Sequence, residues 1–357
     1  MNNDLSSYFE DPEFKEALEK YEGMVKNHTP AYFDADELTD IAEYYASKGR
    51  QIEAEAAIDF ALQLHPNDTD ALIFRARSLA MKGRLDEAYM VMDLIEDRSD
   101  REVRFLKADL LMEEKRMEEA DHVFEELAAY EEGKLETLID IILAYIDANQ
   151  EALAKKWIKH VGETYDLASL SQKNQKFRDL LCDFYITFNN PEAAIPLLQA
   201  TLDCYPYSIN HWNSLGKCYL STNDYEEAHE AIDFALAIDD SNAEALTLKA
   251  FCYQQSGELQ KSCDYYLRLA EQQENKTRAY LALAKTYFEM QDYTSSIYYI
   301  EALLDNKDAL SKYELSELYG DIALCHAALK HIGVGQASIR RSLELNENDP
   351  DTLIVPG

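Results

Sequence analysis

The sequence predicts an all-helical protein built from a repeated helix-turn-helix unit. Three observations lead to this fold class: a self-similarity with a fixed period, apolar stripes at helical spacing, and glycine or asparagine recurring just past the first helix of each unit. Repeats are considered first because a missed period misassigns the whole fold. The 357 residues then form one quasi-linear array that grows by stacking, so length alone does not count its domains.

The period is plainest between residues 212 and 287. Segments that begin at Trp212, Leu246 and Tyr280 align over eight residues, and each segment ends in tyrosine. Each begins 34 residues after the one before it. Self-similarity at this spacing indicates stacked supersecondary units, none of which buries its apolar face alone.

One unit carries a family resemblance almost position for position. Its matching residues are Trp212, Leu215, Gly216, Tyr219, the run Asn223 to Ala228, Ile232 and Ala235. This pattern resembles the tetratricopeptide repeat, and the chain is identified as a member of that family. The resemblance implies an all-α, right-handed α-solenoid (superhelix) of about nine tetratricopeptide helix-turn-helix repeats, which begin near residues 35, 69, 101, 135, 175, 209, 243, 277 and 316.

Each unit also follows from the residues themselves. In the unit from residue 35, apolar side chains stand at i, i+3, i+4 and i+7 from Leu38 to Tyr45, and a second stripe runs from Ala54 to Leu62. Isolated helices of about 12 to 15 residues are marginal in water, so each must pack on its partner and on the next unit. Small residues at the eighth and twentieth positions, such as Ala42 and Ala228, let paired helices approach closely.

The turn between the two helices has its own signal. The fifteenth position holds residues that tolerate the left-handed conformation that ends a helix, namely Gly49, Gly83, Asn149, Asn189, Asn223 and Gly257. Lys115, Gln291 and Lys330 depart from this pattern. Arg75, Lys107 and Lys249 occupy the usually aliphatic seventh position, where we expect their stems to snorkel along apolar surface.

The irregular stretches divide the chain. A helix with Phe14 and Tyr21 on one face is expected over 12–26 as an N-terminal capping helix, the unit from 69 is two residues short, and about five extra residues, 311–315, precede the last unit. The superhelix is expected to change its path at an insertion. The predicted parts are the capping segment 1–34, repeats one to four over 35–168, the inter-repeat insertion 169–174, repeats five to nine over 175–349, and a C-terminal tail 350–357.

The net charge of the chain limits the classes of partner that it is expected to bind. The chain has 68 acidic and 34 basic residues and a net charge of −34, a field that repels phosphate backbones and anionic lipid headgroups. Neither nucleic acid nor a membrane is expected as a partner. The acidity either serves solubility on a long surface, which we favour, or attracts a basic partner. The start has no signal-peptide pattern and no window is apolar enough to span a membrane, so the expected location is cytoplasmic.

The sequence gives no sign of catalytic chemistry. It lacks HExxH, a Walker-type loop, a GxSxG elbow and a Rossmann fingerprint. The six cysteines include no CxxC pair, and the scattered histidines, of which His326 and His331 are nearest to each other, do not show metal-ligand spacing. Adjacent glutamates such as Glu118 and Glu119 are expected on a solvated face. No enzyme activity, cofactor or metal site is therefore predicted.

The family resemblance places binding on the inner, concave wall, which is formed by the first helices. Carried over to this chain, the expected peptide-binding residues are Asn213, Lys217, Phe251, Arg278, Lys285 and Phe288. Exposed aromatic residues beside bases suit an acidic or carboxylate-ended peptide, although Glu244 and Glu289 could pair with the bases instead. Leu248 and Ala282 depart from the residues of the family's chaperone-tail clamp, so that specific ligand is not expected. The alternative site is an apolar N-terminal wall around Phe105 and Leu143.

The predicted function is a non-enzymatic adaptor or scaffold that binds an extended peptide or partner protein along its concave face. The alternative is a structural protein that self-associates as a homo-oligomer through an exposed solenoid end or its convex face. The sequence does not name the partner, because repeat consensus fixes the scaffold while function resides in grafted surface residues.

Overall fold

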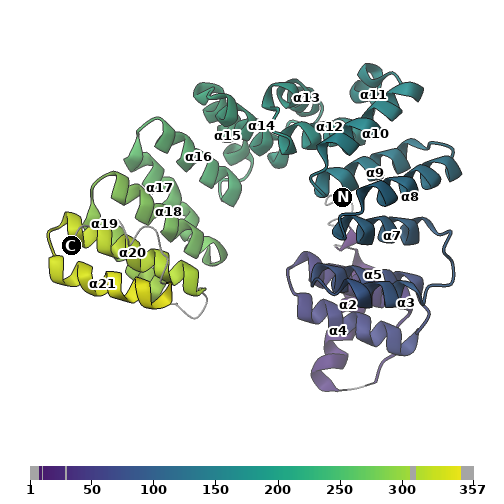
Figure 1. Ribbon diagram of the computed structural model, residues 1–357. Helices are drawn as coiled ribbons and strands as arrows, with labels where there is room; N and C mark the ends of the chain where they lie inside the picture. The colour runs from purple at the N-terminus through teal and green to yellow at the C-terminus, as the bar shows by residue number, and fades with distance from the viewer. Residues whose placement is uncertain (1–7, 10, 29, 306–310, 347–357) are drawn as a thin grey trace. The chain divides into compact units, whose positions relative to one another are not determined.

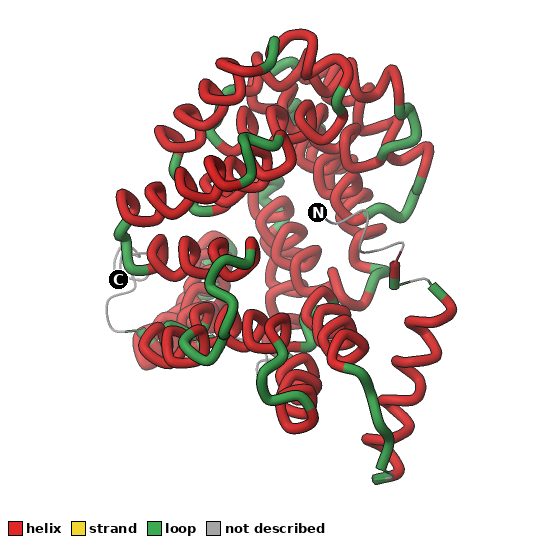
Figure 2. The backbone as a smooth tube through the Cα atoms, turned by 90° about the vertical axis from the view of Figure 1, so that its right-hand side faces the viewer, coloured by secondary structure: helices red, strands yellow, loops and turns green. Residues whose placement is uncertain are grey.

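The computed structural model describes residues 8–9, 11–28, 30–305 and 311–346, and this described part is helical without a strand (Figures 1 and 2). Its helices are α2 (Pro12–Asn27), α3 (Ala35–Ser47), α4 (Gln51–Leu64), α5 (Thr69–Met81), α6 (Leu85–Met92), α7 (Arg101–Glu113), α8 (Met117–Tyr130), α9 (Leu135–Asp147), α10 (Glu151–Thr164), α11 (Leu167–Lys173), α12 (Gln175–Thr187), α13 (Pro191–Cys204), α14 (Ile209–Thr222), α15 (Tyr225–Ile238), α16 (Ala243–Gln255), α17 (Leu259–Ala270), the 3-10 turn η1 (Gln273–Asn275), α18 (Lys276–Glu289), α19 (Tyr293–Leu304), α20 (Lys312–Ala328) and α21 (Ile332–Leu345). The predicted all-α class and stacked helix pairs are confirmed.

The helix starts follow the 34-residue period. Seven first helices begin at the predicted residue, and α18 begins one residue early. Side-chain caps fix several of these starts: Asp68, Asn174 and Asn242 each accept a hydrogen bond from a backbone N–H in the first turn of the helix they precede. The number of true repeats, about nine, stays a prediction, although nine helix pairs lie within the described ranges.

Every predicted turn position adopts the left-handed conformation. Glycine and asparagine do so as expected, for instance Gly49 at φ 71° and Asn223 at φ 64°. The three departures do so as well: φ is 63° at Lys115, 62° at Gln291 and 62° at Lys330. The turn geometry is therefore imposed by the packing of the helix pair even where the side chain disfavours it.

The chain divides into two compact units, 1–164 and 165–357, which are described separately. In the first unit, Phe14 and Tyr21 of α2 are buried in one core with Leu38 and Ile58. The helix predicted at 12–26 is therefore present, and it packs on α3. As expected for a shortened unit, the second helix α6 has only eight residues.

The second unit begins with the predicted insertion. Most of 169–174 is helical, because α11 covers it up to Lys173 and Asn174 caps α12. Arg178, which is buried, donates to the hydroxyl of Thr201 at 2.7 Å and to the carbonyls of Ser171 and Gln172 at 3.3 Å. These bonds hold α11 on the first helix pair of the unit. The expected change of path at this insertion stays a prediction.

Two expectations were wrong. Residues 311–315, predicted as extra residues ahead of the last unit, belong to its first helix: Ser311 and Glu314 make a capping box, and α20 runs from Lys312 over 17 residues. Lys249 does not snorkel to water, since it is 2% exposed and its Nζ lies 3.2 Å from the carbonyl oxygen of His229 and 2.6 Å from Asp233 Oδ1. The predicted tail 350–357 lies outside the described residues, as do residues 1–7 of the predicted capping segment.

Candidate functional site

The predicted binding residues lie on three first helices of the second unit. Lys217 is exposed on α14, Phe251 on α16, and Arg278, Lys285 and Phe288 on α18. These five residues are called the C-terminal strip. Phe251 is 41% and Phe288 39% exposed, which is unusual for rings that have an apolar core beside them.

Asn213 differs from the prediction, because its side chain is 1% exposed. Its Nδ2 donates to Asn242 Oδ1 and to Glu244 Oε2, both at 3.1 Å, so it ties α14 to the start of α16. A buried amide that already holds two acceptors positions a neighbouring helix rather than contacting a ligand. Asn213 is therefore removed from the set of contact residues.

The three bases of the strip differ in whether they form an ion pair. Lys217 forms an ion pair with Glu244, so the pairing considered from the sequence is confirmed here. Glu289 instead accepts two hydrogen bonds from Gln254 Nε2, each at 2.9 Å. Arg278 and Lys285 have no carboxylate within 4.0 Å among the residues that the structure describes. The strip thus presents two uncompensated cations beside two exposed rings.

The first unit carries a hollow on the corresponding helices. Two cavities of about 610 and 460 Å³ lie along α3, α5, α7 and α9, and Arg77 and Glu102 line both of them. The two cavities share these lining residues and are together called the N-terminal groove. Phe105 and Leu143, the alternative site predicted from the sequence, both line it.

The groove is much more acidic than its apolar prediction implied. Its lining includes two bases, Arg77 and Arg101, and nine acids: Asp36, Asp40, Glu43, Asp70, Glu102, Asp109, Glu113, Asp140 and Asp147. Arg77 lies 3.4 Å from Glu102 and 3.5 Å from Asp109, whereas Arg101 pairs with Glu102 and Asp140. Both bases are therefore already bound by more than one carboxylate.

Burial raises the pKa of several of these carboxyl groups. It raises the pKa of Asp109 above its ordinary value, and the nearby Arg77 opposes this shift only in part. Burial is also the largest cause of the raised pKa values of Asp40, Glu43 and Asp70. A raised carboxyl pKa means that the ionised form lacks compensating positive charge.

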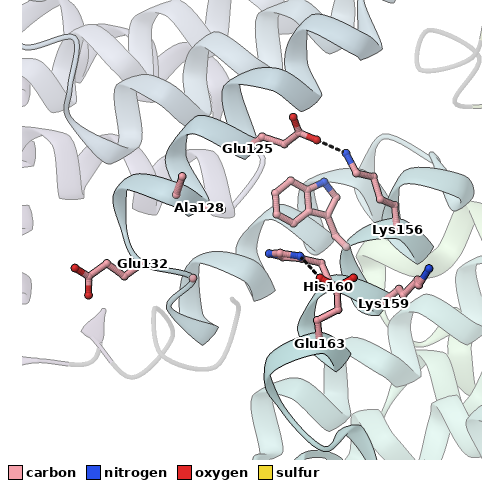
Figure 3. Close-up of a pocket in the computed structure, with 10 residues that line it drawn as sticks. Glu125, Ala128, Glu132, Lys156, Lys159, His160 and Glu163 are labelled. Atoms are coloured by element: carbon pink, nitrogen blue, oxygen red, sulfur yellow. Dashed lines mark hydrogen bonds and ion pairs between the residues drawn. The ribbon is translucent and has the colours of Figure 1, made fainter.

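A third cavity, of about 550 Å³, lies between the second helices α8 and α10 of the first unit (Figure 3). Four of its titratable groups form two pairs: Lys156 lies 2.6 Å from Glu125, and His160 lies 3.1 Å from Glu163. Trp157 is buried, and its indole N–H donates to Asp121 at 2.8 Å. Glu132 and Lys159 also line this cavity, so its remaining charges are of both signs and do not favour one kind of partner.

Other reactive groups are few in the described part of the chain. It contains no group of three or more histidine, cysteine or carboxylate side chains placed to hold a metal ion. Burial raises the pKa of Cys182 to about 12 and that of Cys218 to about 11, so these thiols remain protonated near neutral pH. None of the described helices is long and apolar enough to cross a membrane.

Comparison with known proteins concerns two segments of the chain. The family model described as tetratricopeptide repeat matches residues 39–89 and 213–277. These two segments are tetratricopeptide repeats. The solved C-terminal part of a tetratricopeptide repeat protein from Cytophaga hutchinsonii is similar in fold, with a TM-score of 0.53 and 17% identity over 70% of this chain and 98% of that one.

Two further likenesses cover parts of the chain. The chain is 26% identical over 191 residues to the formate-dependent nitrite reductase complex subunit NrfG of Escherichia coli O157:H7, a match that covers 52% of this chain and 89% of that protein. The solved structure of PilW, a type IV pilus biogenesis factor, has a TM-score of 0.49 at 15% identity and covers 61% of this chain and 96% of its own. Tetratricopeptide repeat proteins generally mediate protein–protein interaction, so this chain is placed in that class.

Proposed function

We propose that this tetratricopeptide repeat protein is a non-enzymatic, cytoplasmic adaptor that holds an extended segment of another protein along the concave face of its first helices. One observation carries the proposal: in a chain of net charge −34, Arg278 and Lys285 stand without an ion-pair partner in the described part, beside the exposed ring of Phe288 on the same helix. Such a combination suits a peptide that offers both carboxylates and apolar side chains.

The contacts of each residue in the strip indicate its role in binding. Arg278 and Lys285 supply positive charge for a side-chain or terminal carboxylate, and the rings of Phe251 and Phe288 supply apolar area, which typically dominates binding energy. Lys217 contributes less, because its ammonium group is already satisfied by Glu244. The segment that best fits the strip is acidic or carboxylate-ended, with an apolar residue nearby.

The test is fluorescence anisotropy with a labelled peptide that carries glutamates, one leucine and a free C-terminal carboxylate. Charge reversal by Arg278→Glu with Lys285→Glu should weaken binding at least tenfold, about 1.4 kcal/mol, because both unpaired cations are lost. The matched control is Lys173→Glu with Arg340→Glu, which makes the same change of net charge at exposed bases of the same unit outside its first helices.

The control variant should keep its affinity, and both variants should keep a helical circular dichroism spectrum. Undiminished binding by the folded Arg278/Lys285 variant would remove the strip from the site. An equal loss in both variants would reduce the effect to the overall charge of the chain. Light scattering at several protein concentrations tests the self-association alternative, for which a dimer that excludes the peptide is the expected sign.

A further inference from the structure

The N-terminal groove differs from the C-terminal strip in the kind of segment it can accept. We infer that it binds an extended cationic segment of another protein, whose lysine or arginine side chains meet the acidic rim while an apolar side chain rests near Phe105 and Met81. The inference rests on the proposed function in one respect, namely that first helices hold an extended segment. It assigns a second site with the opposite charge preference.

The shape of the groove fits an extended chain. It crosses four successive first helices, α3, α5, α7 and α9, whose lining residues join at Arg77 and Glu102. Packed helices stand about 8 to 10 Å apart, so three such steps cover about 24 to 30 Å. An extended chain advances about 3.3 to 3.6 Å per residue, so roughly eight residues fill this length.

The charge of the groove selects the sign of the occupant. Asp36, Glu43 and Asp70, at the end formed by α3 and α5, have no ion pair with any described residue. At the other end, both arginines are shared among several carboxylates. An anionic segment would add like charge to a partly desolvated surface, whereas a lysine or arginine would supply the positive charge that the surface lacks.

The floor of the groove adds an apolar component. Phe105 and Leu106 are buried and form the base, and Leu143 and Ala144 of α9 are half-buried at one side. Met81, at the end of α5, is 84% exposed although it is apolar. Methionine adapts its shape to different partners, so Met81 can close over an apolar side chain next to the bound cations.

The chain itself does not offer a suitable occupant at its C-terminal end. Residues 347–357 contain acidic side chains and no lysine or arginine. They would meet the groove with like charge. The cationic segment is therefore assigned to a different molecule.

The experiment uses the full chain and a labelled ten-residue peptide of alternating arginine and leucine. The groove variant is Glu43→Gln with Asp70→Asn, which removes two unpaired charges with almost no change in side-chain volume. The matched control is Glu118→Gln with Asp86→Asn, exposed acids in the first turns of the second helices α8 and α6. Both variants change the net charge equally, so the long-range field of the chain is the same in each.

Anisotropy should show that the groove variant binds the arginine-leucine peptide at least tenfold more weakly than the parent, while the control variant binds it as the parent does. An equal loss in both variants, or no binding to the parent chain, would overturn the inference. A further variant, Ala144→Arg, places a cation of the chain's own in the groove and should also reduce binding.

The glutamate-containing peptide separates this result from the proposed function. If it still binds the parent through Arg278 and Lys285 while the arginine-leucine peptide does not bind, only the groove assignment fails. If the arginine-leucine peptide binds through the groove while the glutamate-containing peptide does not bind, the C-terminal strip fails and the groove stands.

Discussion

The N-terminal groove and the C-terminal strip are built on the same scaffold but carry opposite chemistry. The ninth position of the repeat is Glu43, Arg77, Asp109 and Leu143 in the first unit and Asp183, Lys217, Phe251, Lys285 and Leu324 in the second. Its bases and its ring in the second unit fall in the three repeats that carry the strip. The eighth position, one residue earlier, is alanine or glycine at nearly every repeat and is buried, as Ala42 and Ala250 show. Neighbouring positions of one helix are therefore under different constraints. Close packing restricts the eighth position, whereas the ninth position is free to vary with the partner.

The comparison also shows how each unit compensates charge. In the second unit, two buried donors are paired locally: the Asn213 amide donates to Asn242 and Glu244, and the Lys249 ammonium pairs with Asp233. In the first unit, nine acids and only two arginines line the N-terminal groove. An excess of partly buried charge lowers stability. A partner that neutralises this excess would therefore bind and stabilise at the same time.

The free energy of unfolding should depend strongly on side-chain volume where the paired helices cross, and only weakly on side-chain volume at exposed positions. Ala228 is fully buried where α15 meets α14, and a side chain at the facing Gly216 would come within 2.7 Å of Ile232 Cγ1. Ala228→Leu should therefore cost about 1 to 3 kcal/mol in the free energy of unfolding. Glu226→Leu, on the exposed side of α15, is the control. Equal melting temperatures for the two would mean that the assumed repeat register is wrong.

Removing the exposed rings of Phe251 and Phe288 should weaken peptide binding at the C-terminal strip and leave binding at the N-terminal groove unchanged. Phe251→Ala and Phe288→Ala should each weaken the glutamate-containing peptide by about 1 to 2 kcal/mol, since aromatic anchors dominate such interfaces. Neither should change the affinity of the arginine-leucine peptide, because both rings belong to the second unit. Titration calorimetry with the two peptides measures both effects. A similar loss of affinity for both peptides would mean that they bind at a single site.

The two sites should differ in their response to pH. Because the pKa of Asp109 is raised, chiefly by burial and further by Glu102 and Asp147 against the opposing charge of Arg77, this group begins to protonate above the usual aspartate range. Lowering the pH through that raised pKa removes a negative charge, so the arginine-leucine peptide should bind more weakly. Asp109→Asn should flatten this dependence as the pH is lowered from neutrality towards the ordinary aspartate range. An unchanged pH profile in that variant would exclude Asp109 from the site.

The smallest expected effect is one that the two units share. Lys115 and Gln291 adopt positive φ without being glycine, which costs an L-residue about 1 to 2 kcal/mol locally. Replacing either by glycine should raise stability by about 0.5 to 1 kcal/mol, since the greater freedom of glycine in the unfolded chain offsets part of the gain. Ala148→Gly, at a right-handed position next to such a turn, should instead lower stability. Denaturant unfolding of the three variants checks the signs.

Much of the fold could be predicted because the 34-residue period repeats its signals. Small residues at the helix crossings, caps such as Asp68 and turns such as Gly49 each recur, so a weak local preference becomes strong when it is seen many times. Even Lys115 was located correctly by its place in the period. The last first helix was predicted to start four residues too late, because a capping box at Ser311 extends it beyond the repeat pattern.

The candidate site was predicted less well, because burial depends on neighbours far away in the sequence. Asn213 looks like a surface residue until Asn242 and Glu244 close over it. The acidity of the groove was also missed. Its carboxylates are spread over more than 100 residues, from Asp36 to Asp147, and only stacking brings them to one surface. A comparison of the charges at the second and ninth positions, repeat by repeat, would have revealed this surface.

The most direct test of two sites with opposite charge preference is photo-crosslinking followed by mass spectrometry. Each peptide carries one benzoylphenylalanine in place of a leucine and is irradiated with the full chain in a separate experiment. The account predicts that the arginine-leucine peptide attaches to residues between 36 and 147, and that the glutamate-containing peptide attaches between 217 and 288. Attachment of both peptides to the same one of these segments would contradict it.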